Sequence, residues 1–450
     1  MDTPNESNRA PLKIPERIRF LKRLRVLLGT YESEIFRALS EDLQKPELES
    51  YGSEIAPVLE EIRSFERNLT RWSEPKQVGT PWWKLIHWGA SSSIRPRPKG
   101  RVLIIGPWNY PFHLSLLPVV GAFACGNRVV LKPSELAPAT SALLKKLIEE
   151  WISDDYVKVI EGDARLSEEL TNRRWDHLFF TGGTEIGKKV MRAAANTLTP
   201  VTLELGGKSP CILDSGLDIK TSLRRILWGK FYNAGQTCVA PDYLLIPKGK
   251  LRETEEAFKA IIQDFYGEKP LLSKDYARIV SRRHFERLVK IKSEAQNFIG
   301  GEIDSENLRI SPMLMSQPNP ESLCMKEEIF GPILPVIEYE GLEEIRQIVA
   351  RHPHPLALYI FSKNSHFQNQ VMDSIPSGGV CINDVLIHLG NSELPFGGIG
   401  TSGLGAYHGY NSFKTFSHFQ SLERKGHFID LPQRFPPYKM KLNKVLKWFV

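Results

Sequence analysis

The sequence predicts an α/β protein of two lobes, each with a mostly parallel sheet. From about Arg101, short apolar runs alternate with longer amphipathic stretches, which is typical of βαβ units. The series begins again after Gly206-Gly207, so a second unit follows the first. The chain has 450 residues, 41% of them hydrophobic, which suffices for two or three buried cores. Ligand sites favour such an interface, so we expect a cleft between the lobes.

The elements follow from apolar periodicity. Helical spacing recurs from Leu21 to Leu28 and from Ile55 to Leu69, and Pro75 and Pro81 then interrupt it. Helical periods also cross Leu217–Tyr232 and Ser281–Ala295, whereas the glycine-rich stretch Gly390–Gly409 favours irregular loop. The predicted strands are Val102–Ile105, Val129–Leu131, Val157–Ile160 and Leu178–Phe180 in the first lobe, and Cys211–Leu213, Tyr243–Ile246, Ile333–Ile337, Leu358–Phe361 and Val380–Ile382 in the second.

Charge and cysteine usage exclude several classes of protein. The net charge is +7, but basic residues are dispersed except in the last seventeen positions, so nucleic-acid binding is not indicated. The five cysteines are far apart and form no C-x-x-C pair, which indicates neither a disulfide framework nor a metal site and favours a reducing, cytoplasmic setting. The polar start has no signal-peptide pattern, and no run of 18 apolar residues predicts a membrane span.

Three motifs offer the groups that acyl chemistry needs. Cys238, in NAGQTC, follows an amphipathic helix, and a thiol there could be exposed and of lowered pKa; the alternative is a buried, inert cysteine. Glu204 ends an apolar strand before two glycines, where burial would raise its pKa and suit a general base; the alternative is an exposed strand end. Asn109, in GPWNYP, could donate to an oxyanion or merely serve the turn.

Two further motifs suit a nucleotide. In the segment Phe180–Gly187 a strand ends in glycines and a helix begins, which offers N–H groups to a phosphate, although the spacing is not G-x-G-x-x-G. Lys132 and Glu135 follow another strand and could hold a ribose, or form a solvated charged turn.

Together these motifs resemble one family. From about Val102 to Phe416 the chain resembles the aldehyde dehydrogenase superfamily, and within it the short class 3 type that includes fatty aldehyde dehydrogenases. The motifs that carry the resemblance are PWNYP, KPSE, FTGGTEIGK, LELGGKSP, NAGQTC, EEIFGP and LPFGGIGTSGLGAYHG.

The resemblance implies an aldehyde dehydrogenase fold, with a Rossmann-like cofactor domain, a catalytic domain and a small oligomerisation element. The implied division is residues 1–80 and 100–205 for the dinucleotide-binding domain, 206–383 for the catalytic domain, 81–99 and 384–416 for the bridging element, and 417–450 for a tail. Class 3 relatives also imply a homodimer in which a strand of one subunit extends the sheet of the other.

The resemblance also implies roles. Cys238 would attack the aldehyde, Asn109 and the Cys238 N–H would hold the oxyanion, and Glu204 would activate the water that hydrolyses the thioester. The implied cofactor is NAD, with NADP also accepted, and no metal. The implied cofactor-binding residues are Lys132 and Glu135 at the adenosine ribose, Thr181, Gly182, Gly183 and Gly187 at the pyrophosphate, and Glu328 with Phe330 at the nicotinamide ribose.

The identity of the aldehyde, the contact of the C-terminal helix and two alternative functions stay open. We expect a medium- or long-chain aliphatic, apocarotenoid or aromatic aldehyde. Leu442, Val445, Leu446 and Phe449 share a helical face beside four lysines, which predicts an amphipathic helix that meets a membrane surface, a partner subunit or the tunnel mouth. An acylating, coenzyme A-dependent relative and a non-catalytic structural or lipid-associated protein are the alternatives; Glu204 and the intact set of motifs argue against them.

Overall fold

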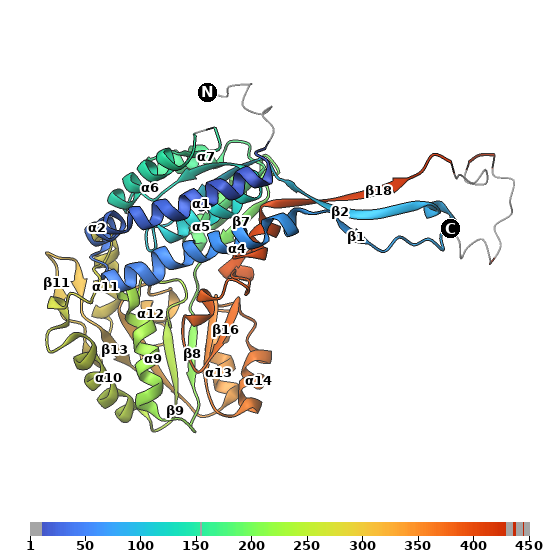
Figure 1. Cartoon of the computed structure of the whole chain (residues 1–450). Coiled ribbons are helices and arrows are strands. Elements are labelled where there is room, and N and C mark those ends of the chain that lie inside the picture. Colours follow the sequence, from blue (N-terminus) through green and yellow to red (C-terminus); the bar gives the residue numbers. More distant parts are fainter. Residues whose placement is uncertain (1–10, 154, 429–434, 438–443, 445–450) are drawn as a thin grey trace.

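Two lobes and a projecting arm make up the molecule (Figure 1). The structure is a computed structural model that describes residues 11–153, 155–428, 435–437 and 444. Each lobe is built on one large sheet covered by helices, as the sequence predicts, and the arm is a third, narrow sheet. The predicted helix at residues 439–449 lies almost wholly outside the described residues. Among the described helices, none is both long and apolar enough to cross a membrane.

The first lobe has a sheet with helices on both faces. Its strands are β3 (Arg101–Ile105), β4 (Arg128–Lys132), β5 (Val157–Val159), β6 (His177–Thr181), β7 (Val201–Glu204) and β17 (Gly403–Leu404), and its helices are α1 (Ile14–Thr30), α2 (Glu32–Leu43), α3 (Glu47–Ser50), α4 (Ala56–Ser73), α5 (His113–Ala124), α6 (Pro138–Trp151), α7 (Ala164–Thr171), α8 (Thr184–Ala195) and α15 (Tyr410–Thr415). The strand order is β17-β7-β6-β3-β4-β5, parallel except for β17.

The continuous apolar run of β3 has a simple cause. Side chains alternate between the two faces of a strand. Val102 and Ile104 therefore enter the core that α1, α4, α5 and α6 build, whereas Leu103 and Ile105 enter a second core under α7 and α8. Both faces are buried, so the strand shows no polar alternation.

The second lobe repeats this plan. Its strands are β8 (Pro210–Leu213), β9 (Tyr243–Pro247), β10 (Phe298–Gly300), β13 (Met313–Ser316), β14 (Ile333–Tyr339), β15 (Ala357–Phe361) and β16 (Gly379–Ile382), and its helices are α9 (Ile219–Phe231), α10 (Leu251–Tyr266), α11 (Arg282–Ser293), α12 (Leu323–Lys326), α13 (Leu342–Ala350) and α14 (Ser365–Ser374). The order is β10-β13-β14-β9-β8-β15-β16, parallel except for β10. A small hairpin joins β11 (Ile303–Asp304) to β12 (Arg309–Ile310).

The arm consists of β1 (Lys76–Val78), β2 (Ala90–Pro98) and β18 (Ser417–Lys425), all antiparallel. β2 and β18 pair along their whole length, and Figure 1 shows them extending away from both lobes. β18 falls in the segment that we assigned to the tail at 417–450, so the arm takes its third strand from beyond the predicted boundary. Its side chains are mostly exposed on both faces, which removes the apolar alternation that marks a strand in a sequence. The division into domains otherwise stays a prediction.

The nine predicted strands all lie within strands of the two large sheets or overlap them closely. The helical segments predicted at 217–232 and 281–295 are α9 and α11. The two lobes meet where the carboxyl ends of β3, β6 and β7 face the loop that precedes β9. That junction holds the candidate active site.

Candidate active site

Cys238 lies in a turn between α9 and β9. The helix ends in the short 3-10 turn Tyr232–Gly235, where Asn233, Ala234 and Gly235 all have positive φ. Gly235 is required there because its φ is +76° and a Cβ would overlap the carbonyl of Gly331. The kinked backbone thus brings the loop that carries Cys238 against the loop that follows Glu328, at Gly331.

The Asn109 loop docks on the cysteine loop. Asn109 is buried, its Nδ2 donates to the carbonyl of Gln236 at 3.1 Å, and its own carbonyl accepts from Asn233 Nδ2 at 2.8 Å. The hydroxyls of Tyr110 and Thr237 also bond, at 2.5 Å. An amide nitrogen carries two N–H donors, so the bond to Gln236 leaves Asn109 one donor for an oxyanion.

A buried ion pair stands behind the Asn109 loop. Lys45 and Glu54 have fully buried side chains and bond to each other. Lys45 Nζ also donates to the Asn109 carbonyl at 3.2 Å and lies 4.2 Å from the centre of the Tyr110 ring. The second oxygen of Glu54 accepts the N–H groups of Phe112 and His113. Sequence reasoning missed this pair, since nothing in the sequence separates it from surface charges.

Glu204 ends β7 and is buried, as predicted. Within the described part of the chain, neither oxygen of its carboxyl group has a hydrogen-bond partner. Burial raises the Glu204 pKa well above its ordinary value, which confirms the expected direction. A buried carboxyl group without hydrogen-bond partners is most stable in its protonated form. Once ionised, it can accept a proton from a nearby water molecule.

Glu328 faces the same strand end. A Cβ at Gly206 would overlap its carboxylate, and the N–H of Gly207 donates to it. Burial, with Asp242 adding repulsion, raises the Glu328 pKa to about 8. Gly206 is therefore required by the close approach of a carboxylate rather than by its own dihedral angles.

The thiol of Cys238 has a pKa raised to about 12, which corrects the expectation of a lowered value. Burial is the main cause, and the carboxyl groups of Glu328 and Glu204 add to it. The N–H groups of Cys238 and Val239 act in the other direction by donating to the sulfur. The turn follows the end of α9, so no helix N-terminus points at the sulfur. In this state Cys238 carries a neutral thiol.

A second buried pair fixes the loop of Glu328. Lys208 Nζ bonds Asp242 and donates to the carbonyls of Cys324 at 2.6 Å and Glu327 at 3.1 Å. Asp242 accepts the N–H of Ile329 at 3.0 Å. Lys208 stands in the motif LELGGKSP, so the sequence carried a signal for it that the prediction did not use.

The same loop carries Phe330, whose φ of +50° is unusual for a large side chain. Arg287 donates to the carbonyls of Glu328 and Ile329, at 3.2 and 2.5 Å, and so holds the backbone in this conformation. The Phe330 ring lies 5.3 Å from the ring of Trp108, which belongs to the Asn109 loop. The loop of Glu328 therefore contacts both other loops of the site.

Most of the residues expected to bind the cofactor lie along the carboxyl ends of β4 and β6, whereas Glu328 and Phe330 lie on the loop before β14. Thr181, Gly182 and Gly183 end β6, and Gly187 packs in the first turns of α8, where a Cβ would overlap Leu205. Lys132 is buried at the end of β4 and bonds Glu135 at 2.6 Å.

This arrangement fits a dinucleotide. Among the described residues, no side chain caps α8, whose N-cap is Gly183, and a Cβ at Gly183 would meet no atom within 4 Å. A pyrophosphate can accept N–H groups there. The role of Glu135 at a ribose, and the preference for NAD over NADP that a carboxylate there would give, stay predictions.

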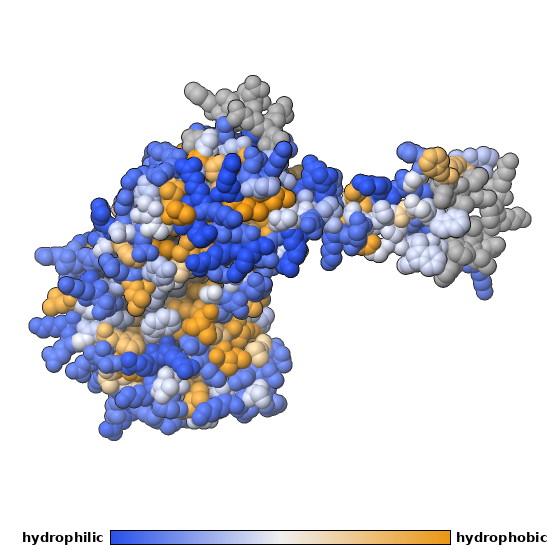
Figure 2. Space-filling model, in the orientation of Figure 1, coloured by the Kyte–Doolittle hydropathy of each residue, from blue (hydrophilic) through white to orange (hydrophobic). Residues whose placement is uncertain are grey.

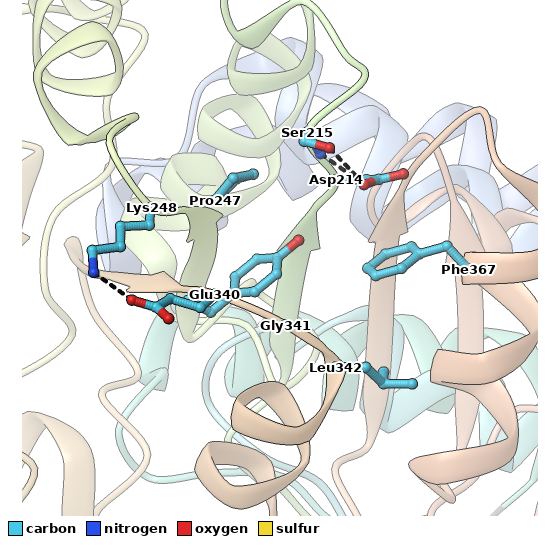
Figure 3. Close-up of a pocket in the computed structure, with 9 residues that line it drawn as sticks. Asp214, Ser215, Pro247, Lys248, Glu340, Gly341, Leu342 and Phe367 are labelled. Carbon is cyan, nitrogen blue, oxygen red and sulfur yellow. Dashed lines mark hydrogen bonds and ion pairs between the residues drawn. The ribbon is translucent and has the colours of Figure 1, made fainter.

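A separate pocket lies at the other end of the second sheet (Figure 3). Asp214, Pro247 and Tyr339 line it at the carboxyl ends of β8, β9 and β14, beside the exposed Lys248–Glu340 ion pair. Cys238 precedes the amino end of β9. The predicted groups therefore meet at the carboxyl ends of the first sheet, where open α/β sheets bind ligands, and not at this pocket.

A nucleotide-binding lobe that faces a cysteine, an amide donor and a buried carboxyl group defines an oxidoreductase of the thiol-dependent class. Residues 7–422 match the aldehyde dehydrogenase family, and the chain belongs to that family. It is therefore an aldehyde dehydrogenase, an enzyme that oxidises aldehydes with NAD or NADP.

Its relatives match over nearly the whole chain. Aldehyde dehydrogenase family 3 member H1 of Arabidopsis thaliana is 44% identical over 438 residues, which are 96% of this chain and 90% of the relative. The 4,4'-diaponeurosporen-aldehyde dehydrogenase of Staphylococcus aureus is 42% identical over 431 residues, which are 95% of this chain and 93% of the relative. A solved structure, described as the substrate-bound state of Staphylococcus aureus AldH, is similar with a TM-score of 0.91 at 42% identity, covering 95% of this chain and 93% of that one.

Proposed function

We propose that this enzyme oxidises an apolar aldehyde through a thioester on Cys238. The observation that carries the proposal is the convergence of three loops on one sulfur. The Asn109 amide bonds the backbone two residues before Cys238, and the carboxyl groups of Glu204 and Glu328 lie near enough to raise the thiol pKa. The thiol gives its proton to solvent, and its sulfur forms a bond to the carbonyl carbon while the π electrons of the C=O bond move to the oxygen. Asn109 and the N–H of Cys238 stabilise the oxygen that becomes charged.

Glu204 acts in the second half of the reaction. A nicotinamide held near Glu328 would supply the hydride acceptor that oxidation of the Cys238 thiohemiacetal to a thioester requires. Glu204 then takes a proton from water, the water oxygen adds to the thioester carbon, and the C–S bond breaks to release the acid and the thiol. The raised pKa of Glu204 suits this step, because a base of higher pKa binds the water proton more tightly.

Cofactor binding is proposed for the residues that the sequence singled out. Thr181, Gly182, Gly183 and Gly187 would hold the pyrophosphate at the start of α8. Lys132 and Glu135 would hold the adenosine ribose. Glu328, with Phe330 beside it, would hold the nicotinamide ribose, because its carboxylate keeps acceptor sites for ribose hydroxyls beside the bond from the N–H of Gly207.

The name of one relative supports a proposal for the substrate class. The Staphylococcus aureus relative is named for 4,4'-diaponeurosporen-aldehyde, and we propose a long-chain aliphatic or apocarotenoid aldehyde for this enzyme, with aromatic aldehydes as the narrower alternative. Such substrates partition into membranes, so we place the enzyme in the cytoplasm with peripheral membrane contact. Contact through the predicted C-terminal helix stays a sequence prediction.

A homodimer is proposed from two sheet edges. β18 lies at the edge of the arm, and β16 lies at the edge of the second lobe's sheet with Val380 and Ile382 more than a third exposed. Pairing of β18 of one copy with β16 of another would cover this apolar edge. Light scattering after size-exclusion chromatography tests it: a dimer that becomes a monomer in Val380→Lys supports the pairing, and a monomeric wild type contradicts it.

The test of the function is a single-turnover experiment. NADH formation is followed with aldehydes of increasing chain length for wild type, Glu204→Gln, Cys238→Ser and the control Cys381→Ser. We expect Glu204→Gln to form one NADH per site and to stop, with the acyl group on Cys238 detected by mass spectrometry. Cys238→Ser should be inactive and Cys381→Ser active. Steady turnover by Glu204→Gln, or turnover that requires coenzyme A, would contradict the mechanism.

A further inference from the structure

The turn that leads to Cys238 has a strained backbone. Asn233 and Ala234 both have a φ of +52°, and Gly235 follows with a φ of +76°. A residue with a Cβ is uncommon in this left-handed region, and two in succession store conformational energy. Such a backbone persists only where the surrounding groups hold it. The first residue of the turn, Asn233, therefore needs partners that fix its position.

Glu49 binds this turn from the other lobe. Its Oε2 accepts the N–H of Asn233 at 3.0 Å. Its backbone carbonyl accepts the hydroxyl of Tyr232 at 3.1 Å, so the residue before Asn233 is bound as well. Glu49 lies on α3 in the first lobe, whereas α9 and the turn belong to the second lobe. One residue thus fastens the start of the Cys238 turn across the junction between the lobes.

The segment that presents Glu49 also supports the oxyanion donor. α3 continues directly into the π-helix Tyr51–Ile55, an element that is rare in proteins and frequent at functional sites. Glu54 of this π-helix forms the buried pair with Lys45, and Lys45 donates to the carbonyl of Asn109. The turn before Cys238 and the loop of Asn109 are therefore attached to the same short segment of the first lobe.

The bond between Glu49 and Asn233 is made away from water. Burial raises the Glu49 pKa to about 7, with Asp275 adding repulsion, whereas the N–H of Asn233 and the charge of Lys45 act in the other direction. Above that pH the acceptor is charged, and a bond to a charged acceptor is stronger than a bond between neutral groups. Asn233 is fully buried, so without the carboxyl group its N–H would lose its acceptor in a place that water does not reach.

We propose that Glu49 is a positioning residue for aldehyde oxidation. By holding Asn233, it orients the turn so that the sulfur and the N–H of Cys238 face the carbon and the oxygen of an aldehyde beside Asn109. The segment from α3 through the π-helix thus places the nucleophile and the amide donor relative to each other. This proposal rests on the catalytic role proposed for Cys238. Its alternative is a contact that only stabilises the junction between the lobes.

The test compares variants of Glu49 in the full chain. Glu49→Leu removes the acceptor, Glu49→Asp shortens its reach by one methylene group, and Glu49→Gln keeps an oxygen that can accept the N–H of Asn233. The control is Glu338→Leu. Glu338 also accepts backbone N–H groups, from Gly249 at 2.7 Å and Leu251 at 3.2 Å. It lies at the end of the second lobe that points away from the first, where the visible surface is mainly hydrophilic (Figure 2).

Steady-state kinetics with NAD and decanal at pH 8 separate positioning from packing. We expect Glu49→Leu to lower kcat by about tenfold to a hundredfold, because a buried donor without its acceptor displaces groups that act in the transition state. KM for NAD should change by less than about twofold, since the turn does not carry the residues proposed to bind the cofactor. Glu49→Asp should also lower kcat, at a melting temperature near that of wild type. Glu49→Gln and Glu338→Leu should keep kcat within about threefold of wild type.

Hydrogen exchange in the peptide 229–239 reports on the turn without turnover. It should be faster in Glu49→Leu and Glu49→Asp than in wild type, and unchanged in Glu49→Gln and Glu338→Leu. An unchanged kcat in Glu49→Asp, or a loss of kcat that Glu49→Gln shares in full, would overturn the proposal and leave a contact that only stabilises the junction. Full activity of Cys238→Ser would instead contradict the proposed role of Cys238, and the exchange rates would still show whether Glu49 holds the turn.

Discussion

The junction between the lobes and the arm are held together in opposite ways. At the junction, the pairs Lys45–Glu54 and Lys208–Asp242 have side chains no more than 4% exposed, and they bond to backbone groups of the loops of the candidate site. In the arm, His87 and Glu423 are 32% and 41% exposed and bond across the sheet edge. When one partner of a buried pair at the junction is removed, water cannot hydrate the remaining charge, whereas water can hydrate a remaining charge in the arm.

The difference shows that the side chains of the candidate site need fixed positions, whereas those of the arm do not. Asn109, Cys238 and Glu328 come from three loops of two lobes, and loops alone do not hold catalytic groups in place. Each buried lysine ties one of these loops by its carbonyl oxygens: Lys45 holds Asn109, and Lys208 holds Glu327. The arm needs only to project, and the backbone pairing of β2 with β18 suffices for that.

The largest expected effect comes from breaking a buried pair. Lys208→Met leaves Asp242 buried and unpaired and frees two carbonyls, so we expect a loss of about 3–5 kcal/mol in the free energy of unfolding. Urea denaturation measures it. The control is Lys248→Met, which breaks the Lys248–Glu340 pair at 68% exposure and should change nothing measurable. Equal effects of the two variants would contradict the comparison.

The next effect is the dependence of stability on pH. Burial raises the Glu204 pKa, so the folded chain keeps this proton at a pH where the unfolded chain has lost it. This group therefore lowers the free energy of unfolding as pH rises above its unfolded pKa, by up to about 1.4 kcal/mol per pH unit. We expect Glu204→Gln to exceed wild type in stability by more at pH 8 than at pH 6, with the exposed Glu327→Gln as control. A constant difference between pH 6 and 8 would show that Glu204 ionises in the folded chain as it does in the unfolded one.

A smaller effect concerns the reactivity of the thiol. Glu328 is the carboxyl group that most raises the Cys238 pKa, which stands at about 12. Glu328→Gln should lower that pKa and speed alkylation by iodoacetamide about threefold to tenfold at pH 9. The gain should shrink at pH 7, because Glu328, with a pKa of about 8, is then largely protonated in wild type. Slower alkylation in Glu328→Gln at pH 9 would mean that this carboxyl group activates the thiol instead.

The sequence predicted the features that depend on a local pattern of residues, namely the strands of the two large sheets and the burial of Glu204. The strands of the two sheets are continuous apolar runs buried on both faces, so their periodicity is visible along the chain. Glu204 was placed correctly because an apolar strand followed by two glycines leaves a carboxyl group at a buried end. The proximity of Asn109, Glu204 and Cys238 followed from the family resemblance and not from spacing, since 129 positions separate Asn109 from Cys238.

What the sequence could not predict depends on partners that are distant along the chain. Lys45 is indistinguishable from a surface lysine until the turn between α2 and α3 packs on the Asn109 loop. The raised pKa of Cys238 depends on two carboxyl groups brought in by other loops, so reasoning from the local helix gave the wrong direction. β18 was missed because a strand exposed on both faces has no apolar alternation.

The smallest effect should come from the arm. The pKa of Glu423 is lowered by hydrogen bonds from Ser92 and His87, so its contribution is present at neutral pH and is lost as pH falls through the lowered value. Because the group is exposed, Glu423→Gln should leave the melting temperature unchanged at pH 7. It should still speed amide exchange at the outer β2–β18 pairs, by a factor of about three, since the bonds of Glu423 to His87 and Ser92 are lost. Hydrogen exchange with mass spectrometry measures this, with peptides of β3 as the internal control. Faster exchange throughout the first lobe would show that the arm is coupled to the body and would break the contrast between the two regions.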